Sequence, residues 1–116
     1  MNFKTLSDED ILAVVNPIMD RLMQGSTEIN HSKHTQDFTE RMKSIVTPER
    51  LEEMCSEYQK RIGFFQARQF VALFRRQDSV AVVWKQFMSK SEDEFVAEAV
   101  FVYRDGRCLV DHAMVF

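Results

Sequence analysis

Hydrophobic residues recur at two different spacings in the two halves of this 116-residue chain. Between residues 7 and 62 they return every three or four positions, which is the period of an amphipathic helix. From residue 64 onward they alternate with polar residues, as they do in half-buried strands. The order predicts a single α+β domain, residues 1–116, in which helices come first and a sheet follows.

Three helices are predicted in the first half. Ser7 is suited to cap the first helix, and an apolar stripe runs from Ile11 to Met23. We expect Pro17 to kink this helix or to divide it in two, because a proline in a helix interior costs about 3 kcal/mol. Gly25 is expected to end it as a left-handed cap, leaving residues 25–30 as a linker.

The second and third predicted helices follow this linker. The second has its apolar face at Phe38, Met42, Ile45 and Val46. The third begins with Thr47 as cap and Pro48 at the first helical position, where the missing N–H costs nothing. Gly63 is expected to stop the third helix.

Polar breaks divide the second half into four predicted strands, at 64–74, 79–88, 94–104 and 107–116. The breaks are short enough for hairpins, so the strands are expected to form an antiparallel meander. The fold class is therefore three N-terminal helices packed on one face of a curved four-stranded antiparallel sheet.

The last hairpin allows the two faces of the sheet to be assigned. A two-residue turn at Asp105-Gly106 pairs Ala99 with His112 and directs the most apolar set of residues toward the helices. A three-residue turn with a glycine bulge would shift the register by one residue and place His112 opposite Glu98. We disfavour that register because it mixes the apolar and charged positions.

The opposite face of the predicted sheet is unusually apolar for a surface in contact with water. We interpret it as the interface of a homodimer, in which Glu98 or Asp111 pairs with Arg104 or Arg107 across a two-fold axis. The predicted dimer face consists of Val96, Glu98, Val100, Val102, Leu109 and Asp111. The alternative is that a curved sheet tolerates exposed valines.

Candidate site residues are few, because the chain contains no nucleophile elbow, phosphate-binding loop or metal motif. We predict a pocket for a small apolar ligand between helices and sheet. Its predicted lining residues are Tyr58, Trp84, Tyr103 and His112. His112 is the candidate catalytic residue, since it is a titratable group on an otherwise apolar face. The alternative is that all four are core residues, with His112 satisfied by one hydrogen bond.

Charge, cysteines and histidines narrow the function further. The net charge is −3 and neither half is basic, which argues against nucleic acid as a partner. Cys55 and Cys108 have no CxxC spacing and are expected to be reduced and buried. His31, His34 and Asp37 have metal-like spacing, but no second cluster completes a coordination shell, and a solvated helix start accounts for them. We expect no metal and no cofactor.

The chain also lacks an apolar stretch near the roughly 18 residues that a membrane span needs. The acidic residue Asp8 falls where a signal peptide would need its apolar run. We therefore expect a cytoplasmic location and no membrane partner.

Three helices followed by a long-stranded meander, closing on residues 104–112 (RDGRCLVDH), resemble the cystatin-like cone of the nuclear transport factor 2-like superfamily, including the SnoaL-like proteins. The resemblance covers most of the chain as topology and is most specific in the final hairpin. It implies dimerisation through the outer face of the sheet. Its enzymes, such as ketosteroid isomerase and scytalone dehydratase, use Asp, His and Tyr residues inside the cone. The resemblance therefore implies that His112 and Tyr103 lie in such a pocket. Those enzymes usually place an early hairpin between helices, and no strand pair is predicted before Gly63.

Together these observations favour a non-catalytic homodimeric module with a small apolar-ligand pocket between helices and sheet. The alternative is a small isomerase, dehydratase or cyclase that uses His112 as general base.

Overall fold

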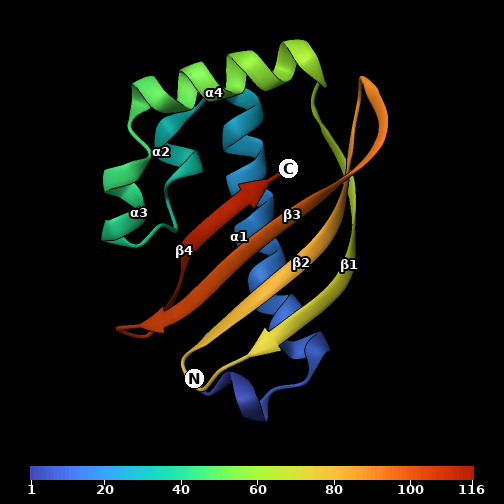
Figure 1. Cartoon of the computed structure of the whole chain (residues 1–116). Helices are drawn as coiled ribbons and strands as arrows, with labels where there is room; N and C mark the ends of the chain where they lie inside the picture. The colour runs from blue at the N-terminus through green and yellow to red at the C-terminus, as the bar shows by residue number, and fades with distance from the viewer.

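The computed structural model describes residues 1–116 and confirms the predicted α+β class, with helices first and a four-stranded antiparallel sheet after them (Figure 1). A short 3-10 turn, η1 (Phe3–Thr5), precedes the helices α1 (Asp8–Glu28), α2 (His31–His34), α3 (Glu40–Ile45) and α4 (Pro48–Arg61). The strands are β1 (Phe65–Arg75), β2 (Ser79–Met88), β3 (Ser91–Arg104) and β4 (Arg107–Val115), arranged in the order β1-β2-β3-β4.

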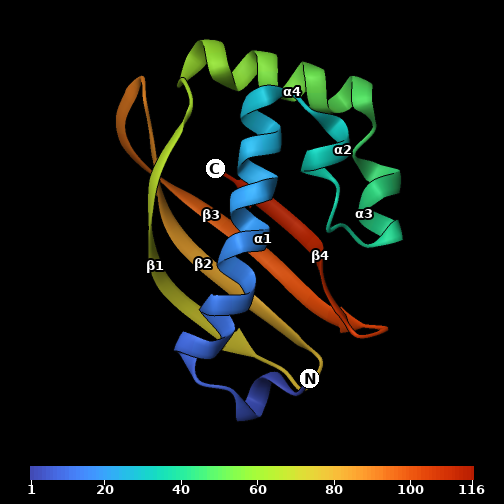
Figure 2. The ribbon, with the colours of Figure 1, turned by 180° about the vertical axis from the view of Figure 1, so that it is seen from behind.

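All the helices lie on one side of the sheet. Figure 2 shows α1 crossing this face, with α4 across one end and α2 and α3 beside β4. In Figure 1 the opposite face is turned toward the viewer, and no helix covers it. We call the covered side the inner face and the uncovered side the outer face. None of the helices combines the length and the hydrophobicity that a membrane-spanning helix needs.

The first helix is not divided at Pro17, and it differs from its prediction by continuing past Gly25 to Glu28. Its apolar stripe is buried against the sheet, and each buried side chain contributes about 1.5–3 kcal/mol, which together exceeds the cost of the proline. Ser7 caps the helix as predicted, its side-chain oxygen accepting a hydrogen bond from the Asp10 nitrogen at 3.1 Å. The left-handed residue that ends it is Ile29, with φ 51°.

The predicted second helix is divided into α2 and α3 by a segment that pairs with the edge of the sheet. The nitrogen of Val110 donates to the Asp37 carbonyl at 2.7 Å, and the nitrogen of Thr39 donates to the Val110 carbonyl at 3.0 Å. Phe38, between them, is buried. The backbone of residues 37–39 therefore forms hydrogen bonds with β4 instead of continuing a helix.

The third predicted helix and the boundaries of the strands agree closely with the structure. Thr47 caps α4 with Pro48 in its first turn, and Gly63 follows the helix with φ 87°. β2 has the predicted bounds, whereas β3 begins earlier, at Ser91. The Asp105-Gly106 turn is also confirmed, since both of its residues have positive φ, at 54° and 74°.

The register of the final hairpin is correct up to Val110 and wrong beyond it. Phe101 pairs with Val110 as predicted, but Val100 then pairs with His112, so Asp111 is an extra residue in β4. This β-bulge moves each later residue of β4 to the other face. Ala99 pairs with Ala113 rather than with His112.

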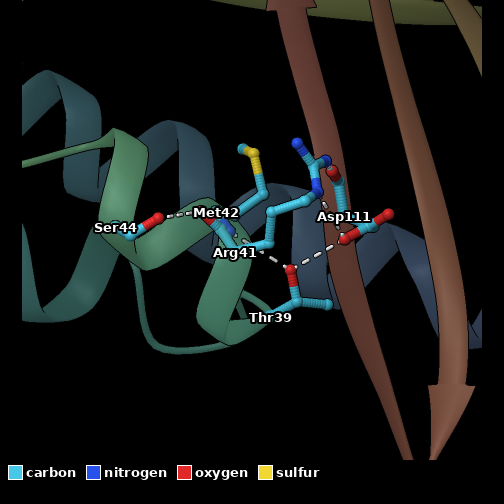
Figure 3. A network of polar contacts seen from close by, with 5 residues as sticks. All are labelled: Thr39, Arg41, Met42, Ser44 and Asp111. Atoms are coloured by element: carbon cyan, nitrogen blue, oxygen red, sulfur yellow. Dashed lines mark hydrogen bonds and ion pairs between the residues drawn. The ribbon is translucent and has the colours of Figure 1, made fainter.

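The side chain of Asp111 explains where the bulge forms. Its Oδ1 accepts hydrogen bonds from Thr39 Oγ1 at 2.8 Å and from Arg41 Nε at 3.2 Å (Figure 3). Arg41 also donates to the Asp111 carbonyl. The bulge thus turns Asp111 toward α3, where a carboxylate receives charge-assisted hydrogen bonds, instead of leaving it on the outer face of the sheet.

The hydrophobic core fills the space between the helices and the inner face. Its largest side chains with almost no exposure are Trp84, Phe3, Phe101, Ile11, Met19 and Leu51. Cys55 and Cys108 are free and buried, as expected from their spacing.

Candidate ligand-binding site

A cavity of about 380 Å³ lies among α1, α2, α3, α4 and the last residues of β4, and we call it the helix–sheet cavity. Twelve of its 16 lining residues are hydrophobic. The rim includes Met54 and Met114, which are about half exposed, together with the exposed pair Glu57 and Arg61 on α4. The cavity is therefore a mostly apolar space with exposed residues at its rim.

Three hydroxyl and thiol groups meet in one wall of the cavity. Ser26 Oγ lies 2.7 Å from Tyr58 Oη and 3.2 Å from Cys55 Sγ. Burial raises the pKa of Tyr58, hydrogen bonds with Ser26 and Gln59 partly offset this effect, and Cys55 raises the pKa further, so the phenol keeps its proton at neutral pH. These three groups are joined by two hydrogen bonds through Ser26, which bring α1 and α4 together.

His34, in α2, supplies a different kind of polar group. Its Nδ1 lies 2.8 Å from the Leu22 carbonyl, and because a carbonyl only accepts, Nδ1 carries the proton. Burial lowers the pKa of His34, the hydrogen bond to Leu22 opposes that change, and His31 lowers the pKa further. The ring is therefore neutral at pH 7, and its Nε2 is an acceptor.

Gly25 allows His34 to occupy this position. A Cβ at Gly25 would lie 2.4 Å from the His34 nitrogen and 2.6 Å from its Cα, so only glycine permits this close approach of α1 and α2. The ring of His34 also packs edge-on against Phe38, with centroids 5.2 Å apart. The glycine predicted as a helix cap instead fixes the position of a cavity side chain.

The four residues predicted to line a pocket do not come together. Tyr58 lines the helix–sheet cavity, whereas Trp84 is buried in β2 beneath Arg68, whose guanidinium carbon lies 5.2 Å from the indole centroid. Tyr103 is half-buried in β3 near the final turn. His112 lies on the outer face, where its Nε2 is 2.7 Å from Oε2 of Glu98.

Sequence reasoning missed the polar residues that line the cavity beside Tyr58. These are Ser26, His34 and Cys55. A solvated helix start was the interpretation of His31 and His34, but both rings bond to backbone carbonyls, His31 to that of Val46 and His34 to that of Leu22. The available signal was Gly25, since a glycine within an apolar helical stripe indicates a close approach by another segment.

Five of the six predicted dimer-face residues lie on the outer face. Val96, Val100, Val102 and Leu109 are accompanied there by Glu98, and the bulge adds His112 and Met114. Asp111 is the exception, as described above. Arg107 is also engaged within the chain, donating to the Gln36 carbonyl at 2.8 Å and to Asp37 Oδ1 at 3.1 Å.

No protein-family model and no curated protein matches this sequence. Solved structures are similar in fold. A protein from Thiobacillus denitrificans described as a calcium/calmodulin-dependent protein kinase type II association domain is 9% identical, with a TM-score of 0.62 over 86% of this chain and 91% of its own. A designed protein named Rd1NTF2_05 is 14% identical, with a TM-score of 0.64 over 94% of this chain and 100% of its own.

The chain has the nuclear transport factor 2-like fold. A DUF4783 family protein from Bacteroides uniformis is also similar, at 10% identity and a TM-score of 0.53 over 83% of this chain and 93% of its own. Identities this low show the fold alone. As expected, the chain has no strand before β1, so no early hairpin separates its helices.

Proposed function

We propose that this nuclear transport factor 2-like domain is a non-catalytic homodimeric module that binds a small apolar molecule in the helix–sheet cavity. The observation that carries the proposal is the cavity itself. Its volume of about 380 Å³ lies within the range of about 300–1,000 Å³ that is usual for small-molecule pockets. Its lining is mostly apolar with a few polar groups, which is the usual composition of such pockets.

The outer face supports the homodimeric part of the proposal. Phe74 and Met114, on this face, are 58% and 52% exposed and flank the valines of β3. Glu98 and His112 satisfy each other among these apolar side chains. A second copy of this surface would remove the apolar area from water, and one similar structure is described as an association domain.

The alternative of an enzyme with His112 as general base receives less support. The Glu98–His112 pair has the geometry of an acid–base pair, with 2.7 Å between its two polar atoms. It lies on the outer face and does not line the helix–sheet cavity. A substrate in that cavity would therefore have no contact with His112.

Filling the cavity tests the ligand-binding part. Ala113 lines the cavity, so Ala113→Leu is expected to occupy part of it and to weaken binding of the neutral fluorescent probe N-phenyl-1-naphthylamine at least tenfold. Ala13→Leu, on the exposed side of α1, is the matched control and is expected to bind as the native chain does. Native and Ala113→Leu chains with equal affinity would show that the probe binds elsewhere.

Sedimentation velocity tests the dimer. We expect the native chain to sediment as a dimer and Val100→Lys, which places a charge on the outer face, to sediment as a monomer. Ile45→Lys is the control, because Ile45 is an exposed apolar residue on α3. A native chain that is monomeric at all accessible concentrations would contradict this part of the proposal.

A further inference from the structure

We infer that the molecule bound in the helix–sheet cavity carries one neutral hydrogen-bond donor, such as the hydroxyl of an alcohol or phenol, on an otherwise apolar body, and that His34 Nε2 recognises it. This inference rests on the proposed function and names the class of ligand that the same cavity would select. It depends on which polar groups in the cavity wall are donors, which are acceptors and which already have a partner in the chain.

His34 lines the helix–sheet cavity, and the free nitrogen of its ring is an acceptor and not a donor. Its proton is committed to Nδ1 by the Leu22 carbonyl at 2.8 Å, which leaves the lone pair of the neutral ring on Nε2. No group of the chain donates a hydrogen bond to Nε2. A ligand that displaced water from this part of the cavity would leave Nε2 unsatisfied unless it brought a donor.

The other polar groups of the wall are already paired. Ser26, Cys55 and Tyr58 bond among themselves, and Arg61 Nε lies 2.6 Å from Glu57 Oε1 at the rim. His34 is therefore the polar group of the wall that most needs a partner from the ligand. One free acceptor in an apolar cavity matches one donor on an apolar molecule.

The charges around the cavity disfavour an ionised ligand. Its one cationic side chain, Arg61, is paired with Glu57 and exposed at the rim, so a buried carboxylate would meet no free cation. An ammonium group would approach a neutral imidazole within an apolar wall, and its lost hydration would not be restored. A neutral hydroxyl has a much smaller desolvation cost and supplies the donor that Nε2 lacks.

The position of His34 is fixed before a ligand arrives. Gly25 holds the backbone of His34 against α1, and Phe38 contacts the edge of the ring. The Leu22 hydrogen bond fixes the orientation of the imidazole. A ligand therefore needs to spend little binding energy on ordering this side chain, which favours discrimination by the single hydrogen bond.

The test compares 1-naphthol with 1-methoxynaphthalene, because the two share an apolar body and only the first has a donor. Both dissociation constants are measured by calorimetry for the native chain and for His34→Phe. We expect the preference for 1-naphthol, expressed as the ratio of the two constants, to fall about tenfold in His34→Phe. His31→Phe is the matched control, because His31 also bonds to a backbone carbonyl but does not line the cavity.

A second measurement needs no variant. Acidification protonates Nε2, so the native chain is expected to lose its preference for 1-naphthol as the pH falls below the ordinary histidine range, while the ether binds with unchanged affinity. If both probes bind but neither His34→Phe nor acid alters their ratio, the role of His34 is wrong and the proposed function stands. If neither probe binds the native chain, the proposed function is wrong and the inference fails with it.

Discussion

Gly25 in α1 and His34 in α2 lie so close together that a Cβ on the glycine would stand 2.4 Å from the His34 nitrogen. The contact is between two backbones, so no side-chain rotation relieves it. It joins the helix that covers the sheet to the histidine that lines the cavity. Stability and the position of a cavity-lining histidine therefore depend on the same glycine.

Gly25→Ala is expected to lower the free energy of unfolding by about 2 kcal/mol, because the displacement of α2 outweighs the better helix propensity of alanine. Urea unfolding followed by circular dichroism measures the change. Gln24→Ala, at the exposed position just before it, is the control and should change stability by less than about 0.5 kcal/mol. A Gly25→Ala chain as stable as the native one would show that α2 moves without cost.

Asp111→Asn is expected to destabilise the chain by about 1–2 kcal/mol, because Asp111 accepts hydrogen bonds from both Thr39 and Arg41 where α3 meets β4 (Figure 3). Thermal or urea unfolding at neutral pH measures this loss. Glu40→Gln, which removes an exposed charge from the same helix, should have almost no effect.

The pKa of Asp111 gives this ion pair a pH dependence. Burial raises that pKa, but the hydrogen bonds from Thr39 and Arg41 and the nearby positive charges outweigh burial, so the net direction is downward. A carboxyl with a lowered pKa in the folded chain stabilises it above the ordinary aspartate range and loses that contribution as pH falls through its folded pKa. The stability difference between the native chain and Asp111→Asn is therefore expected to shrink below about pH 4.

Protonation of His34 is expected to lower the free energy of unfolding in a different pH range. Its pKa is lowered by burial, so the unfolded chain binds a proton more readily than the folded chain. The stabilising contribution of the neutral histidine is then fully present above the ordinary histidine pKa of about 6.5, and it declines as the pH falls below that value. Urea unfolding between pH 8 and pH 5 should show a smaller decline for His34→Asn than for the native chain, and equal declines would contradict the assignment of a neutral histidine.

Cys108 should be unreactive in the native chain. Burial raises its pKa to about 11, and the negative charge of Asp37 contributes to the rise. Cys55 is buried against Ser26. Iodoacetamide at pH 8 is expected to label neither residue without denaturant and both in urea, as counted by intact mass. Labelling of one cysteine under native conditions would identify a region that opens without global unfolding.

The parts of the fold that depend on local chemistry could be predicted from the sequence. Thr47-Pro48 marks the start of α4 because a cap and a first-turn proline are favourable nowhere else in a helix. Asp105-Gly106 marks the final turn because both residues tolerate positive φ. These signals involve only neighbouring residues, and the structure agrees with both of them.

The errors arise where distant segments decide the local structure. Residues 37–39 leave the helical pattern because Val110, more than 70 positions away, needs backbone partners. The bulge at Asp111 depends on Thr39 and Arg41 in the same way. The alternation along β4 therefore predicted the face of each residue up to Val110, but it did not predict the bulge that reverses the faces beyond Asp111.

The bulge also makes β4 unusually sensitive to its length. Side chains alternate between the two faces along β4, and the extra residue at Asp111 decides which of residues 112–115 point to the inner face and which to the outer face. Removing a single codon there would bring His112 inward and Ala113 outward without changing the chemistry of any remaining residue. Such a deletion would move the cavity-lining side chains at the end of β4 to the outer face and the outer-face side chains into the cavity wall. We therefore expect this strand to tolerate substitutions far better than insertions or deletions.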